Sequence, residues 1–320
     1  MWSAPTSDFS IVSSPAVANG SVYIGSPDHK LYVFPAKGCG NPVCSALWTG
    51  ATGGAIDAAP LAANGVVYIG SQDSKLYAFD AKGCGQTNCS PLWTAATGGP
   101  IDSSAALGKG VLYVGSEDGQ LYAFSASGCG QPTCQPLWSG HVGTTIFASS
   151  PAVANGVVYI GSFDGELVAF DAAGCGASTC QPLWTGDAGE FIDSSPAVAN
   201  GVVYLGSGDD FLYAFDVSGC AHSPCPPLWR GQAVGAQAAV LSAPTVANGL
   251  VYVGENNGMV VVYNAKGCGK AFCLPVTQLL THNEPIVNSS PTVVNGSVYF
   301  GSADQLVPPH GRLYVFKLFP

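Results

Sequence analysis

Residues 150–186 have the sequence SPAVANGVVYIGSFDGELVAFDAAGCGASTCQPLWTG, and variants of this stretch recur along the whole chain. One marker is a Tyr-x-Gly triplet that occurs seven times, with its glycine at Gly25, Gly70, Gly115, Gly161, Gly206, Gly254 and Gly301. A second marker is a Cys-x4-Cys segment that recurs every 45 to 48 residues and uses all 12 cysteines, at Cys39/Cys44, Cys84/Cys89, Cys129/Cys134, Cys175/Cys180, Cys220/Cys225 and Cys268/Cys273. A fixed period of this size indicates structural units that stack or pack around an axis.

Each unit carries the pattern of four short strands. In the quoted copy these are residues 151–154, 157–161, 167–171 and 182–185, rich in β-branched and aromatic residues and separated by Asn-Gly and Asp-containing turns. Such runs and turns are typical of strands and hairpins. No stretch has a helical period, so the sequence predicts an all-β chain.

Four antiparallel strands in a unit of about 40 to 50 residues are typical of a β-propeller blade. The sequence predicts one domain, residues 1–320, forming a seven-bladed β-propeller of four-stranded antiparallel blades. The expected repeats lie near residues 13–50, 58–95, 103–140, 148–186, 193–231, 241–279 and 288–320 plus 1–3.

The two ends of the chain indicate how the ring closes. Residues 313–316 supply the third strand of the seventh repeat, and no fourth strand follows them, whereas Met1-Trp2-Ser3 matches Leu47-Trp48-Thr49 in the first repeat. We expect residues 1–3 to complete blade seven. This closure explains why seven markers accompany only six cysteine pairs, because the pairs lie between the third and fourth strands.

The repeat resembles that of the pyrroloquinoline-quinone-like (PQQ-like) propeller family over nearly the whole chain, through SPAVANGVVYIGS, LYAFDA and LWTG. The resemblance implies the propeller fold and leaves the function open, because the family includes quinoprotein dehydrogenases, outer-membrane assembly scaffolds and other exported proteins. The chain departs from the usual repeat where GCGxxxC replaces a short Thr-Gly-Lys turn.

Twelve cysteines at one local spacing predict six disulfides, each closing one Cys-x4-Cys hairpin, and therefore an oxidising compartment. Zinc is the alternative, because thiolates are good zinc ligands. Each pair is expected on a different blade, which disfavours a shared tetrahedral site. We expect an extracellular or periplasmic protein whose export signal lay upstream and has been removed.

The charge composition excludes nucleic acid as an expected partner. The chain has 10 basic and 20 acidic residues, a net charge of −10, and a nucleic-acid site needs a basic face. No apolar run reaches the roughly 20 residues of a transmembrane helix.

Two sets of repeated residues are expected to be structural. Tryptophans recur once per blade, at Trp2, Trp48, Trp93, Trp138, Trp184 and Trp229, as packing between blades requires. Aspartates in the turn between the second and third strands, at Asp28, Asp73, Asp118, Asp164, Asp209 and Asp304, are expected to hydrogen-bond the turn backbone.

A third set is a candidate cation site. Asp57, Asp102, Asp193 and Asn288 each come just before a first strand, and first strands line the channel of a propeller. Crowded carboxylates there would raise one another's pKa values or bind a cation such as calcium. The alternative is that they only cap the incoming turn.

Departures from the repeat are the best candidates for a binding site. The loop from Trp229 to Pro244 is three residues longer than that from Trp48 to Pro60, the loop from Thr277 to Pro291 is two longer, and residues 304–312 carry an insertion. The candidate binding residues in this sector are Arg230, Gln232, Gln237, His282, Asn283, Glu284, His310 and Arg312.

The expected function is a non-catalytic extracytoplasmic scaffold that binds a protein or cell-surface partner through the loop face of blades six and seven. No nucleophile elbow, zinc-binding helix or Walker loop occurs. A PQQ-dependent dehydrogenase is one alternative, but those enzymes often stack the quinone on an adjacent cysteine pair, which this chain lacks. A carbohydrate-binding propeller is the other.

Overall fold

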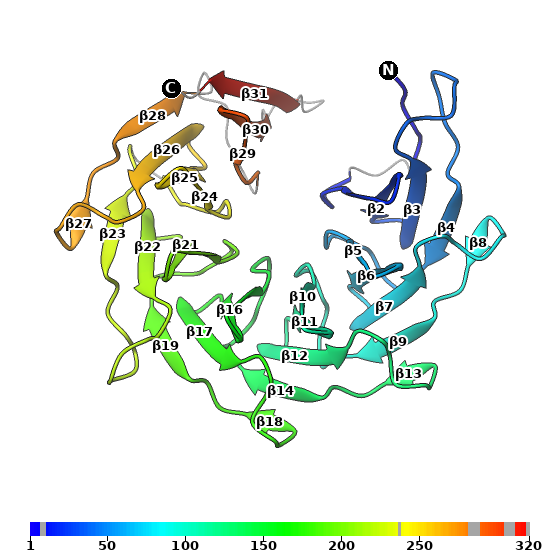
Figure 1. Ribbon diagram of the computed structural model, residues 1–320, viewed down its shortest axis with the longest axis horizontal. Coiled ribbons are helices and arrows are strands. Elements are labelled where there is room, and N and C mark those ends of the chain that lie inside the picture. The colour runs from blue at the N-terminus through cyan, green and yellow to red at the C-terminus, as the bar shows by residue number, and fades with distance from the viewer. Residues whose placement is uncertain (7–10, 236–237, 281–288, 304–310, 318–320) are drawn as a thin grey trace. The chain divides into compact units, whose positions relative to one another are not determined.

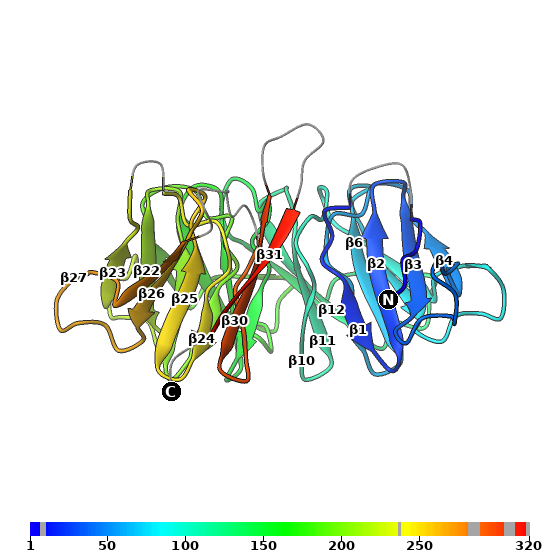
Figure 2. The same ribbon diagram turned by 90° about the horizontal axis from the view of Figure 1, so that it is seen from above.

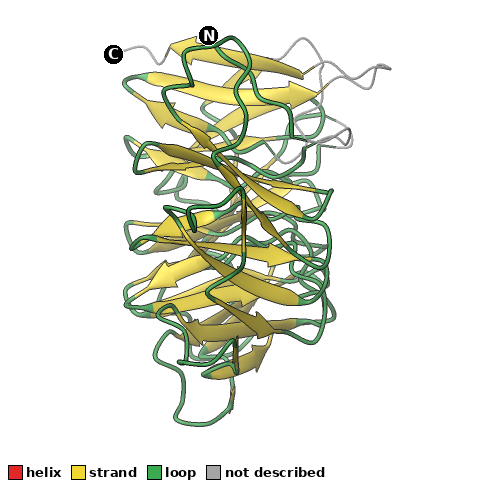
Figure 3. Ribbon diagram, turned by 90° about the vertical axis from the view of Figure 1, so that its right-hand side faces the viewer, coloured by secondary structure: helices red, strands yellow, loops and turns green. Residues whose placement is uncertain are grey.

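All regular elements in the described part of the chain are strands (Figures 1 and 3). The computed structural model describes residues 1–320 apart from 7–10, 236–237, 281–288, 304–310 and 318–320. The chain divides into two compact units, Met1–Gly156 with Ala172–Gln181 (unit 1) and Val157–Asp171 with Pro182–Pro320 (unit 2). The described residues include no helix long and apolar enough to span a membrane.

Unit 1 contains three sheets built on one plan, four antiparallel strands followed by a two-residue strand from the next repeat. The first sheet is β1 (Ala16–Ala18), β2 (Ser21–Ser26), β3 (Lys30–Pro35), β4 (Trp48–Ala51) and β8 (Asn88–Cys89). The second is β5 (Leu61–Ala63), β6 (Val66–Ser71), β7 (Lys75–Asp80), β9 (Trp93–Ala96) and β13 (Thr133–Cys134). The third is β10 (Ala106–Gly108), β11 (Val111–Gly115), β12 (Gln120–Ser125), β14 (Trp138–His141) and β18 (Thr179–Cys180), and β15 (Ala152–Ala154) also belongs to this unit.

Unit 2 continues the same plan. Its strands are β16 (Val157–Gly161), β17 (Glu166–Asp171) and β19 (Trp184–Asp187); β20 (Ala197–Ala199), β21 (Val202–Gly206), β22 (Phe211–Asp216), β23 (Trp229–Gln232) and β27 (Phe272–Cys273); β24 (Thr245–Ala247), β25 (Leu250–Gly254), β26 (Met259–Asn264) and β28 (Thr277–Leu280); and β29 (Thr292–Val294), β30 (Ser297–Ala303) and β31 (Gly311–Lys317). The strands follow one another in the predicted order, and the last sheet has three strands, β29, β30 and β31.

Asn-Gly turns set the first hairpin of the sheets, except in the third sheet, where Lys109-Gly110 takes the same place. Asn64 and Gly65 both have positive φ, 52° and 81°, as a two-residue turn between antiparallel strands requires. This turn pairs Leu61 with Tyr68 and Ala63 with Val66. In the first sheet, β1, β2 and β3 lie side by side in the same way (Figure 2).

The tyrosine of the Tyr-x-Gly marker links five of the repeats to the next one, whereas the buried Tyr252 hydroxyl has no hydrogen-bond partner among the described residues. Tyr68 is buried, and its hydroxyl donates a hydrogen bond to the Ala126 carbonyl of the next repeat at 2.8 Å. Equivalent bonds join Tyr23 to Ala81 and Tyr204 to Ala265. The phenol body fills the core while its polar tip stays hydrogen-bonded, which favours tyrosine over phenylalanine at this position.

The tryptophans pack between neighbouring sheets, as predicted. Trp48 is 4% exposed, and its ring lies 6.2 Å from the ring of Phe79 in the next repeat. The same indole covers Gly83, where an added Cβ would lie 2.6 Å from Trp48 Cδ1. The glycine before the first cysteine is therefore required by the tryptophan of the preceding repeat.

The six predicted disulfides are present, and the described residues include no free cysteine. Each hairpin does more than close the corner of its own sheet, because its second half pairs with the last strand of the preceding sheet. β8 runs parallel to β4 and pairs Asn88 with Thr49 and Cys89 with Gly50. Local spacing could not reveal this pairing between repeats.

Residues 1–3 take the place of such a last strand before the first hairpin. Ser3 forms a parallel bridge with Val43, its amide donates to the Pro42 carbonyl at 2.8 Å, and Cys44 donates to the Ser3 carbonyl at 2.8 Å. Trp2 covers Gly38 as Trp48 covers Gly83. The likeness between residues 1–3 and 47–49 is thus confirmed within unit 1.

Candidate functional site

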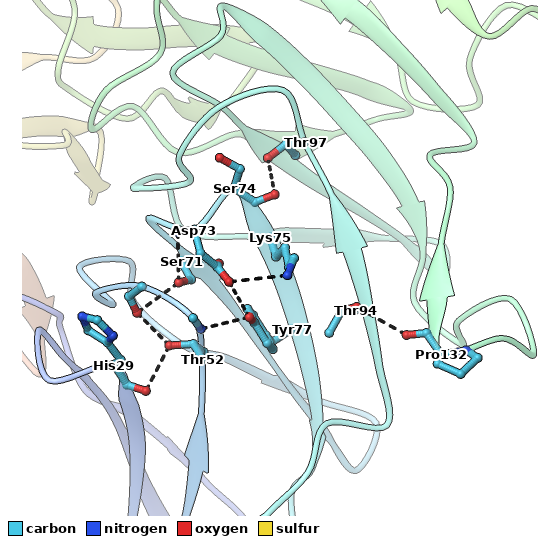
Figure 4. Close-up of polar contacts among 12 residues, drawn as sticks. His29, Thr52, Ser71, Asp73, Ser74, Lys75, Tyr77, Thr94, Thr97 and Pro132 are labelled. Carbon is cyan, nitrogen blue, oxygen red and sulfur yellow. Dashed lines mark hydrogen bonds and ion pairs between the residues drawn. The ribbon is translucent and has the colours of Figure 1, made fainter.

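The second repeat shows the polar network that the consensus sequence builds at the turn between its second and third strands (Figure 4). The Tyr77 hydroxyl donates to Asp73 Oδ2 at 2.5 Å and accepts from the Gly53 amide at 3.0 Å. Lys75 Nζ lies 3.9 Å from the same carboxylate oxygen. Burial, together with the hydrogen bond to Asp73, raises the pKa of Tyr77 to about 12. These contacts support the structural interpretation of the turn aspartate.

The sheet of β20, β21, β22, β23 and β27 changes three positions of this plan, and the structure brings them together. Phe211 replaces the lysine at the position of Lys75, and Arg230 replaces the threonine at the position of Thr94. The third change is Phe272, in the hairpin that follows. At the equivalent positions of the second sheet, Thr133 pairs with Thr94, and Phe272 pairs with Arg230 in the same register. The three side chains converge because β22, β23 and β27 are adjacent in one sheet.

The converging side chains form what we call the aromatic corner, Phe211, Arg230 and Phe272. Arg230 Cζ lies 4.7 Å from the centroid of the Phe211 ring and 4.1 Å from that of Phe272. The two rings meet at an interplanar angle of 64°. A guanidinium over two aromatic faces is held by cation–π attraction, which strengthens as the group loses water.

The aromatic corner opens into a pocket of about 580 Å³ in unit 2. Besides Arg230 and Phe272, the pocket is lined by Asp187, Gly189, Asp209, Tyr213, Pro224, Cys225, Pro226, Pro227 and Ala271. Phe272 is 54% exposed, which is a high exposed fraction for a phenylalanine, and three prolines line the pocket with it. The pocket therefore combines one cation, two carboxylates and an apolar wall.

Among the described residues, Arg230 has no carboxylate within ion-pair distance. Lys30 and Lys75, by contrast, are paired with Asp28 and Asp73. The Arg230 guanidinium lies close enough to the Tyr213 hydroxyl to lower the pKa of Tyr213, but burial and the hydrogen bond to Asp209 outweigh it and raise that pKa to about 12. Asp209 Oδ2 accepts the Tyr213 hydroxyl at 2.6 Å, and Asp187 Oδ1 accepts the Gly189 amide at 2.9 Å. Both carboxylates thus have internal partners.

The other predicted binding residues fall in different places. Arg230 lies within β23, directly after Trp229, and not in a loop as expected, because the longer loop begins only after this strand. Gln232 is exposed at the end of β23, and Arg312 is exposed in β31. Gln237, His282, Asn283, Glu284 and His310 lie outside the described residues.

The predicted cation set is divided between the two units. In unit 1, Asp57 accepts a hydrogen bond from Gln72 Nε2 at 2.8 Å, and burial with the charge of Asp102 raises the pKa of Asp57. Burial and the neighbouring Glu117 raise the pKa of Asp102 to about 6. The structure therefore brings Asp57 and Asp102 together and adds Glu117, which the sequence pattern did not single out.

Asp193 belongs to unit 2, where burial raises its pKa, and Asn288 lies outside the described residues. Within the described ranges, no three His, Cys, Asp or Glu side chains are grouped to hold one metal ion. The calcium hypothesis at these positions stays a prediction.

Glu255 is a departure from the repeat that the sequence analysis missed. It occupies the position of the buried serines Ser26, Ser71, Ser116, Ser162, Ser207 and Ser302, and it is fully buried. Its carboxylate accepts the Val234 amide at 3.0 and 3.2 Å and Asn257 Nδ2 at 3.1 Å. Burial raises the pKa of Glu255 to about 7. The sequence could have indicated this site, because Glu255 is a charged residue at a position where the other repeats have serine.

Two solved structures are similar to the chain in fold. BamB from Moraxella catarrhalis has a TM-score of 0.69 and 19% identity, over 91% of this chain and 80% of that one. The computationally designed Ika8 protein has a TM-score of 0.71 and 17% identity, over 96% of this chain and 83% of that one. No curated protein matches the sequence.

One protein family matches most of the chain. Residues 84–174 and 129–307 match the family of PQQ-like repeats described as outer membrane protein assembly factor BamB. The matched stretch includes five of the six disulfide hairpins and the whole aromatic corner. The chain is a member of this BamB family of PQQ-like propellers.

Proposed function

We propose that the protein is a non-catalytic extracytoplasmic scaffold that binds a protein partner through unit 2. The observation that carries the proposal is the convergence of Phe211, Arg230 and Phe272, three departures from the repeat, beside a pocket that Arg230 and Phe272 line. Packing is satisfied by Lys75, Thr94 and Thr133 at the equivalent positions, so packing alone does not explain the change. Membership of a family described as an assembly factor supports a protein partner.

Six disulfides support an extracytoplasmic location, because disulfides persist in oxidising compartments and are rare in the cytosol. In this proposal the partner surface of blades six and seven also includes the sequence segments that carry His282, Asn283, Glu284 and His310, together with Arg312 of β31. We place the aromatic corner at the centre of this surface, because arginine and aromatic side chains dominate binding energies at protein interfaces.

The proposed scaffold is a seven-bladed ring in which residues 1–3 complete the sheet of β29, β30 and β31. Trp2 and Ser3 support this proposal because they already occupy the last-strand position before the first hairpin. In the first sheet, Trp48 pairs with Val33 of the third strand. The equivalent contact in blade seven would join Trp2 to Val315.

Site-specific photo-crosslinking tests the function. A photoreactive residue at Gln232, exposed at the end of β23, should capture a discrete partner from the extracytoplasmic fraction of the source cells. The matched control is Ala96, which is exposed at the equivalent end of β9. Equal capture at both positions, or capture at neither, would contradict a partner surface on unit 2.

The described tryptophans and the cysteines lend no support to a quinone site. Trp48, Trp93, Trp138, Trp184 and Trp229 are all between 4% and 6% exposed, so none presents a free ring face for stacking. All 12 cysteines are used in local disulfides, which leaves no adjacent pair as a platform. A quinoprotein dehydrogenase stays the alternative that titration with PQQ tests, with quinone absorbance on the protein as its positive result.

Carbohydrate binding is a second candidate, favoured by two equivalent pockets of about 450 Å³ each in unit 1. One is lined by Leu92, Trp93 and the Gly128–Gly130 hairpin, the other by Leu137, Trp138 and the Gly174–Gly176 hairpin. A repeated ligand could occupy one pocket per blade. Binding of a polysaccharide on a glycan array that Leu92→Ser weakens would support this candidate.

A further inference from the structure

We propose that the aromatic corner binds the carboxylate of an aspartate or glutamate side chain in the partner polypeptide. This inference rests on the proposed function and names the group that the unit 2 surface recognises. It starts from Arg230, whose guanidinium lies over Phe211 and Phe272 and has no ion-pair partner among the described residues. An arginine fixed in this way presents its in-plane N–H groups in the geometry that a carboxylate accepts in pairs.

The surroundings of the aromatic corner favour an acidic ligand on one side. Lys266 and Lys270 are exposed on the hairpin that also carries Phe272. With Arg230 they make up three of the ten basic residues of an otherwise acidic chain. A ligand carboxylate at Arg230 would also be attracted by these two charges, and salt would weaken that attraction.

The acidic residues of the pocket limit the ligand's charge. Asp187 and Asp209 already accept hydrogen bonds from Gly189 and Tyr213, and Tyr213 is also a neighbour of the Arg230 guanidinium. The two aspartates would repel a doubly charged phosphate or sulfate more strongly than a single carboxylate. The pocket therefore suits the single charge of a side-chain carboxylate better than a doubly charged anion.

The apolar wall indicates that the carboxylate belongs to a polypeptide and not to a small acid. Phe272, Pro224, Pro226 and Pro227 line the pocket beside the guanidinium. Apolar side chains next to an acidic residue could bury against this wall, and apolar burial stabilises by about 25 cal/mol per Å². A free carboxylic acid such as acetate would make the charged contact only.

Arginine side-chain NMR tests the proposal on the intact protein, because the chain has only two arginines, Arg230 and Arg312. The probe is a capped hexapeptide of alternating glutamate and proline, and the control peptide has glutamine for glutamate. We expect saturable movement of the Arg230 Nε–H signal with the glutamate peptide and at least tenfold weaker binding of the glutamine peptide. Raising the salt concentration should weaken the glutamate peptide selectively.

Consensus substitutions provide variants that should still fold, because other repeats carry the introduced residues. Arg230→Thr should lower the peptide affinity at least tenfold, and Phe272→Thr severalfold while the Arg230 signal stays visible. Lys266→Ser should weaken binding about twofold, whereas Lys82→Ser, at the equivalent position of the second repeat, should leave it unchanged.

The proposal is overturned if the Arg230 signal does not respond to the glutamate peptide, if the glutamine peptide binds equally well, or if Arg230→Thr keeps the affinity. Tighter binding of a sulfated polysaccharide than of the glutamate peptide would also overturn it. If the peptide result is negative and Gln232 still captures a partner, only the ligand chemistry is wrong. If the Gln232 crosslink fails as well, the proposed function fails with it.

Discussion

Glu255 shows how one residue departs from a repeat and what the departure costs. The other repeats place a buried serine there, and serine needs no charge in the core. Glu255 instead has a fully buried carboxyl group. Two amide donors, from Val234 and Asn257, offset part of the free-energy cost of its desolvation. The carboxylate links the turn of the sixth repeat to the loop that follows β23, beside the sector where the repeat is least regular.

The first prediction is a pH dependence of stability that Glu255→Ser removes. The pKa of Glu255 rises from 4.5 to about 7 in the folded state, so folding favours the protonated form. The cost of ionisation is absent below the unfolded pKa, grows as the pH rises, and is complete above the folded pKa. Denaturant unfolding at pH 5 and pH 8 should show the wild type losing on the order of 2–3 kcal/mol relative to the variant.

Asp102 has a raised pKa too, but it titrates in both proteins and cancels in the difference. Parallel pH profiles of the wild type and Glu255→Ser would show that the buried carboxyl group does not limit stability.

Among the elements, the disulfide hairpin connects neighbouring sheets more than it braces its own. A disulfide that closes so short a loop removes little entropy from the unfolded chain. Its second cysteine, however, lies in the two-residue strand that pairs with the preceding sheet, as Cys89 does with Gly50. The hairpin therefore holds an edge strand that would otherwise be open.

The second prediction concerns Gly83 and Gly85, which flank Cys84 and have nearly the same φ, +80° and +77°. An alanine at either position has the same backbone strain, but only at Gly83 would its Cβ meet the Trp48 ring, at 2.6 Å. Gly83→Ala should therefore be less stable than Gly85→Ala by about 1–3 kcal/mol in thermal or denaturant unfolding. Equal losses of stability in the two variants would show that the Trp48 ring moves aside without a free-energy cost.

The third prediction is a local loss of hydrogen-exchange protection when one hairpin loses its disulfide. The Thr49 amide donates to the Thr87 carbonyl in the second hairpin, and the Thr94 amide donates to Pro132 in the third. In the variant Cys84→Ser/Cys89→Ser, the Thr49 amide should exchange about tenfold faster, the change that follows from about 1.4 kcal/mol of local stability. The Thr94 amide is the internal control, and acceleration of both amides would indicate global loosening instead.

Sequence reasoning predicted the strands, the Asn-Gly turns, the disulfides and the inter-sheet tryptophans, because each is encoded by residues close together in the repeat. It missed the parallel pairing of β8 with β4, since that contact joins two repeats. It named Arg230 and missed Phe211 and Phe272, because the three positions are 19 and 42 residues apart in the chain. Only the strand register shows that they meet.

For the whole molecule, closure of the ring is the proposal that the sequence supports most directly. The N-terminal residues already act as a last strand toward the first hairpin. A ring closed in this way leaves no sheet edge open to pair with another molecule, which is the usual hazard of an edge strand.

The fourth prediction tests closure by a double-mutant cycle between Trp2→Ala and Val315→Ala. If residues 1–3 complete the seventh sheet, these side chains pair as Trp48 and Val33 do in the first. The two losses in unfolding free energy should then differ from additivity by about 0.5–1 kcal/mol or more. Additive losses would place residues 1–3 apart from β31.

The central claim is that the aromatic corner exists for binding and not for packing. The most direct measurement compares the wild type with the variant Phe211→Lys/Arg230→Thr/Phe272→Thr, which introduces the residues found at all three equivalent positions of the second sheet. Two quantities are needed from each protein: the melting temperature and the affinity for the partner captured at Gln232. We predict a melting temperature within a few degrees of the wild type and at least a tenfold loss of affinity. Unchanged affinity, or a variant that unfolds because its core needs these side chains, would contradict the account.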